Sequence, residues 1–168
     1  MSTLTARPMS LVSVEFDELY ARHLCRHSQF GINVAHLLAL LGTWFGVYGA
    51  VYWLVRSEWV LVGLATGYVV AMAPNLPVRV LLASAAFMAG LVALVLWVPL
   101  LPLWAYLVMV PVWYKLQSWS HKLFSAARDM TEFDRKYRKG FVLFVVLLLY
   151  EVPLVLNYLL FDRKSWAA

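Results

Sequence analysis

The sequence predicts an all-α polytopic membrane helix bundle of about five transmembrane helices plus an N-terminal amphipathic helix. Of 168 residues, 63% are hydrophobic and only 14% are charged, a balance far outside that of soluble proteins. The apolar residues gather in runs that are mostly long enough to cross a membrane. Charges lie at the ends of these runs, so membrane topology and anionic lipids explain the net charge of +5 better than nucleic acid does.

We expect a single membrane domain at residues 13–161, between tails at residues 1–12 and 162–168. Five apolar runs, separated by prolines or charged residues, predict five spans within it. These spans are approximately residues 32–55, 59–73, 80–98, 103–119 and 141–161. The second has only 15 residues, about 22 Å of helix, so it could be distorted or re-entrant.

A surface helix is predicted before the first span. Ser13 can cap its N-terminus, acidic residues favour its first turn, and apolar residues recur at a spacing of about four. On this amphipathic helix His23 and His27 lie one turn apart and point the same way.

The basic residues predict the orientation of the chain. Five spans with a cytoplasmic N-terminus place eleven of the 14 lysine and arginine residues inside and three outside. The positive-inside rule therefore favours an odd number of crossings in an integral, multi-pass membrane protein. In this arrangement all four histidines lie on the cytoplasmic side.

The four histidines predict a metal site. His23 and His27 come from the surface helix, His36 from the start of the first span, and His121 from the end of the fourth. Imidazole is a common ligand for iron, zinc and copper, and separate helices can hold several imidazoles almost rigidly. The competing interpretation is that these side chains lie at headgroup level, as amphipathic residues do at a membrane interface.

Further polar residues share the predicted helix face of His121. Gln117 lies one turn before it, and Ser125, Asp129 and Glu132 follow at offsets of four, eight and eleven residues if the helix continues. Carboxylates there could complete a metal site or orient its ligands. We therefore predict Gln117, Asp129 and Glu132 as catalytic candidates.

One carboxylate, Glu151, lies inside the last predicted span. Intramembrane carboxylates are functional candidates by default. The predicted topology nevertheless places Glu151 near mid-membrane, some distance from the histidines. A structural hydrogen bond to Tyr150, Asn157 or another helix is therefore the competing interpretation.

Two stretches resemble a known family. They are His27-Ser28 with His36 after eight intervening residues, and Gln117-Ser-Trp-Ser-His121-Lys-Leu-Phe124. Both are similar to motifs of the multi-pass membrane 2-hydroxy fatty acid dioxygenases, known from phytosphingosine breakdown in yeast and widespread in bacteria. The resemblance implies an Fe(II) enzyme of α-oxidation that shortens a 2-hydroxy acyl chain by one carbon. It also implies that His27, His36 and His121 are iron ligands with Gln117 close by, whereas His23 matches no family position.

The sequence departs from the family pattern after Phe124. Ser125 stands where the family has glutamate, and the Pro-Ala that usually follows is absent. Asp129 or Glu132 could take over the role of the missing carboxylate. The departure also leaves open a non-catalytic accessory subunit of a larger membrane complex. For the enzyme we expect Fe(II), a lipid or fatty-acyl substrate and membrane lipids as partners, and no nucleic acid.

Overall fold

The computed structural model describes residues 14–124 and 140–167, and throughout these residues it contains helices and no strand. This confirms the all-α prediction for that part of the chain. Ser13, the predicted cap of the surface helix, lies outside it. The elements are α1 (Phe16–Arg26), α2 (Phe30–Val55), α3 (Glu58–Met72), α4 (Val78–Trp97), α5 (Leu103–Leu123), α7 (Phe141–Leu156), the π-helix η1 (Asn157–Phe161) and the 3-10 helix η2 (Arg163–Ala167).

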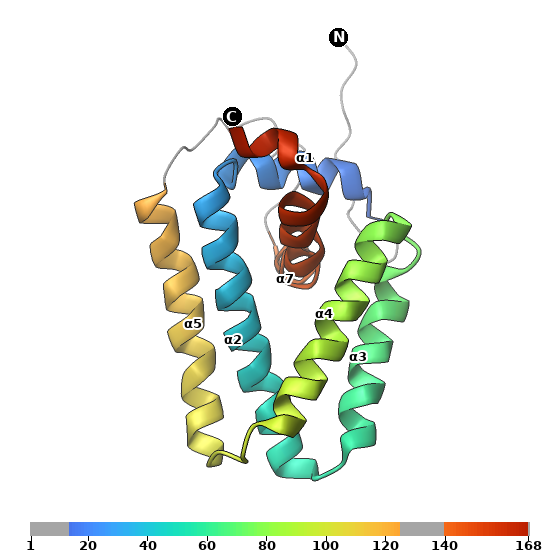
Figure 1. Cartoon of the computed structure of the whole chain (residues 1–168), viewed down its shortest axis with the longest axis vertical. Helices are drawn as coiled ribbons and strands as arrows, with labels where there is room; N and C mark the ends of the chain where they lie inside the picture. Colours follow the sequence, from blue (N-terminus) through green and yellow to red (C-terminus); the bar gives the residue numbers. More distant parts are fainter. Residues whose placement is uncertain (1–13, 125–139, 168) are drawn as a thin grey trace.

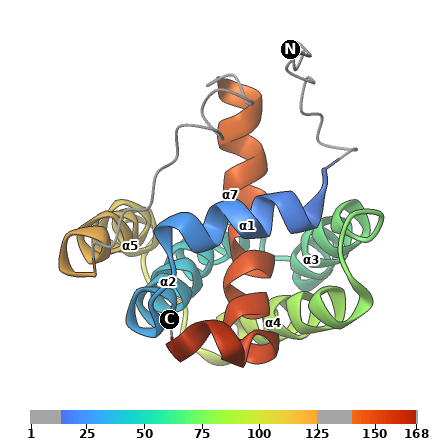
Figure 2. The same cartoon turned by 90° about the horizontal axis from the view of Figure 1, so that it is seen from above.

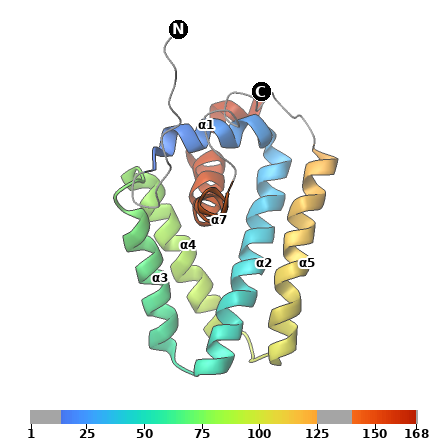
Figure 3. The same ribbon diagram turned by 180° about the vertical axis from the view of Figure 1, so that it is seen from behind.

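Four helices run lengthwise and two run across them. Helices α2, α3, α4 and α5 extend along the long axis of the molecule, whereas α7 is seen end-on between them near one end (Figure 1). Seen from above, α7 is viewed from the side and α1 crosses over it (Figure 2). The view from behind shows the same arrangement (Figure 3). Helix α1 is therefore a surface helix at one end of the bundle, as the amphipathic pattern predicts.

Five upright spans are not confirmed. Within residues 14–124 and 140–167, three helical segments are long and apolar enough to cross a membrane: α2, α4 and residues 144–161 of α7 with η1. Helix α3 is a shorter apolar helix of 15 residues. Since α7 lies across α2 to α5, the last predicted span does not run alongside the others. An apolar composition indicates that a segment is shielded from water. It does not indicate the direction in which that segment packs against the other helices.

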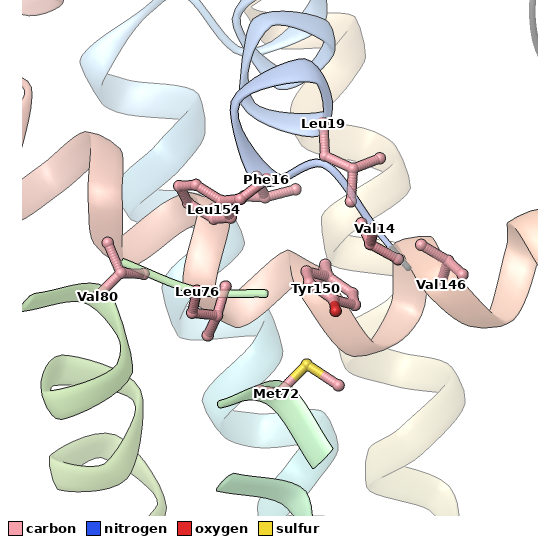
Figure 4. Packing of buried hydrophobic residues seen from close by; sticks show 9 residues of the cluster. All are labelled: Val14, Phe16, Leu19, Met72, Leu76, Val80, Val146, Tyr150 and Leu154. Atoms are coloured by element: carbon pink, nitrogen blue, oxygen red, sulfur yellow. The ribbon is translucent and has the colours of Figure 1, made fainter. Parts of the chain in front are cut away.

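Helix α7 is held in place by an apolar cluster under α1. Val146, Tyr150 and Leu154 are spaced four residues apart on α7. They form one face of this helix, which packs against α1 and the connection between α3 and α4. Figure 4 shows the cluster, which consists of Val14, Phe16, Leu19, Met72, Leu76, Val80, Val146, Tyr150 and Leu154. The hydroxyl of Tyr150 also accepts a hydrogen bond from Asn75 Nδ2 at 2.9 Å. Because successive helix residues point about 100° apart, Glu151 is directed away from the face that carries Tyr150.

Helices α2 and α5 approach each other closely along glycines of α2. A Cβ atom at Gly49 would collide with the ring of Tyr106, and one at Gly42 would collide with the ring of Trp113. Tyr106 is fully buried, so its ring has no free space into which to move. Small residues of this kind allow close backbone approach between membrane helices. This packing holds the end of α5 beside the beginning of α2.

We expect Gly49→Ala to lower the free energy of unfolding by about 1–3 kcal/mol, because the added methyl overpacks the contact with Tyr106. Gly63→Ala in α3 is the matched control, since a Cβ there meets no atom within 4 Å. The control should leave stability unchanged or slightly higher, because alanine has fewer unfolded conformations than glycine. Thermal unfolding of both variants in the same detergent measures the difference. Equal unfolding midpoints for the two variants would contradict the predicted packing.

Candidate metal centre

Three helices bring three histidines together. His27 directly follows α1, His36 lies in the second turn of α2, and His121 lies in the last turn of α5. The ring centre of His27 is 4.4 Å from that of His36 and 4.8 Å from that of His121, and the latter two are 4.9 Å apart. One nitrogen from each ring lies within 4.8 Å of the other two. These three residues form a group that could hold a metal ion.

The C-terminal segment fixes the turn that carries His27. Tyr158 of η1 is fully buried, and its hydroxyl donates a hydrogen bond to the Ser28 carbonyl at 2.7 Å. The hydroxyl of Tyr20 in α1 donates to Asp162 Oδ2, also at 2.7 Å. Both contacts join residues more than a hundred positions apart, and together they anchor α1 and its connection to α2. Sequence patterns gave no indication of either contact.

The hydrogen bonds of His27 and His36 leave one nitrogen of each ring available. Nδ1 of His27 lies 3.2 Å from the His23 carbonyl oxygen, which can only accept, so this Nδ1 carries the hydrogen. Nδ1 of His36 lies 2.9 Å from Glu151 Oε1 and donates in the same way. Nε2 of each ring then has a free lone pair. Both Nε2 atoms are buried and have no hydrogen-bond partner among the residues that the structure describes.

These two nitrogen atoms fit a bound cation. A buried acceptor without a partner costs about 1–3 kcal/mol, and a metal ion between the rings would satisfy both lone pairs at once. A ligand histidine typically donates its other N–H to a carboxylate or a carbonyl, as His36 and His27 do here. The donor set contains imidazole and no thiolate, which suits iron, zinc or copper.

Glu151 belongs to this site, which corrects its predicted place away from the histidines. Its Oε1 accepts hydrogen bonds from His36 Nδ1 and, at 3.1 Å, from Gln117 Nε2. The nitrogens of Gln117 and His36 are 3.3 Å apart, but both are donors here, so the carboxylate joins them. Tyr150 bonds to Asn75 rather than to Glu151. The crosswise direction of α7 brings Glu151 to the histidines.

His23 lies beside the group, but its Nε2 contacts Asn33, and its predicted role as a ligand stays a prediction. The amide nitrogen of Asn33 donates to the carbonyl oxygens of His27 and Gln29, at 2.6 and 2.9 Å. The amide oxygen must then face His23 Nε2, 2.7 Å away, and accept its hydrogen. The ring of His23 stacks on His27 at 4.3 Å. His23 therefore supports His27, and sequence reasoning included it from its location alone.

Of the other predicted site residues, the structure describes Gln117 alone. Gln117 lies at the site, through its hydrogen bond to Glu151. Asp129, Glu132 and Ser125 lie outside the residues that the structure describes. Their predicted roles therefore stay predictions.

A cavity of about 200 Å³ opens onto the three histidines. Its walls are partly polar and partly apolar, and the apolar part comes from Leu19, Leu147 and Leu154. Burial lowers the pKa of His27 well below its ordinary value, and burial also lowers the pKa of His121. Both rings are therefore neutral at neutral pH, the form that binds metals.

No family model, curated protein or solved structure matches this chain. The resemblance to the 2-hydroxy fatty acid dioxygenases therefore stays a prediction.

Proposed function

We propose that this chain is an integral membrane, Fe(II)-dependent dioxygenase that removes one carbon from 2-hydroxy fatty acids. The observation that carries the proposal is the pair of buried Nε2 lone pairs on His27 and His36, beside His121 in one cavity. Three protein ligands leave open coordination positions, as catalytic metal sites require. The choice of iron rests on the similarity of the two histidine stretches to those enzymes.

The chain's own residues would orient the metal and shape the substrate site. Glu151 would hold the His36 ring and increase its basicity, and Gln117 would hold the carboxylate in turn. The apolar wall of the cavity would receive the beginning of an acyl chain. When bound, iron would supply the redox chemistry and the open positions for O₂ and substrate. Because a fatty acid already lies in an apolar bilayer, chain-length selectivity should depend on the shape of the cavity more than on total apolar burial.

The test is oxygen-dependent turnover of 2-hydroxypalmitate by anaerobically Fe(II)-loaded protein. One 2-hydroxy acid and one O₂ should give the fatty acid one carbon shorter, CO₂ and water, so mass spectrometry should detect pentadecanoate. Palmitate, which lacks the 2-hydroxyl group, is the matched control substrate and should not be consumed.

Iron-loaded protein that consumes no O₂ with 2-hydroxypalmitate would refute the dioxygenase. Constant co-purification with other membrane subunits, together with that negative result, would favour the accessory subunit instead.

A further inference from the structure

Two arginines of α1 share the cavity with the three histidines. Arg22 and Arg26 lie one turn apart on that helix, and both line the cavity. Of the described residues that line it, Glu151 is the only acidic one, and its Oε1 already accepts hydrogen bonds from His36 and Gln117. Arg26 therefore brings a positive charge to the described wall of this cavity, and a divalent cation on the histidines would add to it.

Arg26 is the cavity-lining arginine that adjoins a candidate ligand in the sequence. It directly precedes His27, lies in the last turn of α1, and is exposed. Arg26 and the three candidate ligands thus line the same cavity.

The chemistry of this wall suits a carboxylate joined to an apolar chain. A guanidinium group presents a rigid, planar set of donors that binds both oxygens of a carboxylate. The apolar side chains Leu19, Leu147 and Leu154 line the same cavity and suit methylene groups. An anionic head beside an apolar tail therefore matches the distribution of charge around the histidines.

We propose that Arg26 binds the carboxylate of the acyl substrate and positions the adjacent carbon beside His27, His36 and His121. This inference rests on the proposed function for the identity of the acid. The competing explanation is that Arg26 only complements the negative end of the α1 helix dipole.

Binding to zinc-loaded protein in nanodiscs tests the proposal without turnover, because zinc is not redox-active. The probes are radiolabelled 2-hydroxypalmitate and hexadecane-1,2-diol, which has the same chain length but no carboxylate. Arg26→Gln should weaken binding of the acid about tenfold, as expected for a lost charge-assisted hydrogen bond, and should leave binding of the diol unchanged. Arg26→Lys should lose less affinity for the acid, because lysine retains the positive charge.

Lys122→Gln is the matched control. Lys122 is exposed, directly follows the candidate ligand His121, and is not among the residues that line the cavity. It should bind the acid like the unmodified protein. Zinc content and the thermal midpoint of each variant show whether the fold is intact, and Arg26→Lys serves as the test if Arg26→Gln does not fold.

Three results would overturn the assignment: equal losses for Lys122→Gln and Arg26→Gln, equal losses for acid and diol, or no binding of 2-hydroxypalmitate. A larger Arg26 dependence for lysophosphatidate would assign a phosphate head and overturn the carboxylate. The role of Arg26 and the proposed dioxygenase activity can fail independently of each other. Arg26-dependent binding without turnover by iron-loaded protein supports this inference and refutes the dioxygenase, whereas unchanged turnover by Arg26→Gln does the reverse.

Discussion

Purified His36→Ala protein should contain almost no bound transition metal. The substitution removes one of the two buried Nε2 atoms and leaves Glu151 without its histidine partner. Loss of an outer-shell partner alone typically costs about 10–100-fold in metal affinity, so loss of a ligand should cost more. Elemental analysis after anaerobic Fe(II) loading should show about one iron per chain in the unmodified protein and nearly none in His36→Ala or His121→Ala.

His23→Gln is the control that makes this experiment specific. The glutamine amide can still donate to Asn33 Oδ1, so the contact between α1 and α2 is retained while an imidazole is lost. We expect this variant to keep its iron. If His23→Gln loses as much metal as His36→Ala, the assignment of His23 as a supporting residue is wrong. If even the unmodified protein holds little of any transition metal, the metal centre itself is wrong.

The sequence predicts the lengthwise helices well. The predicted spans 32–55, 59–73 and 80–98 correspond to α2 (Phe30–Val55), α3 (Glu58–Met72) and α4 (Val78–Trp97). Their limits could be predicted because each apolar run ends at a charged residue or a proline, where the helix ladder or the apolar environment ends. The direction of α7 could not be predicted, because it depends on the packing of Tyr150 and Leu154 under α1.

The sequence predicts which histidines form the site, but not the hydrogen bonds that join them to their neighbours. His27, His36 and His121 share one predicted membrane face, and the structure brings them together. Glu151 was misplaced because its depth was inferred from an upright span. The role of His23 depends on the orientation of the Asn33 amide, which two backbone carbonyls fix. Contacts between residues distant in the sequence leave no periodic pattern that a single sequence reveals.

Glu151→Gln should weaken metal binding by about 10–100-fold without abolishing it. The glutamine oxygen can still accept the hydrogen of His36 Nδ1, so the ring keeps its orientation, but the negative charge that increases its basicity is gone. Competition between the protein and a chelator for zinc measures the change. An affinity equal to that of the unmodified protein would show that the carboxylate charge does not act on the metal.

Gln117 provides the complementary substitution. It reaches the site through its hydrogen bond to Glu151 Oε1, so Gln117→Ala should weaken zinc binding less than Glu151→Gln does. If Gln117 acts only through the carboxylate, the double variant should lose less affinity than the sum of the two single losses, expressed as free energies. Strictly additive losses would instead mean that Gln117 acts on the metal independently of Glu151. Comparing the two single variants with the double variant thus separates a residue that orients the carboxylate from one that contacts the bound ion.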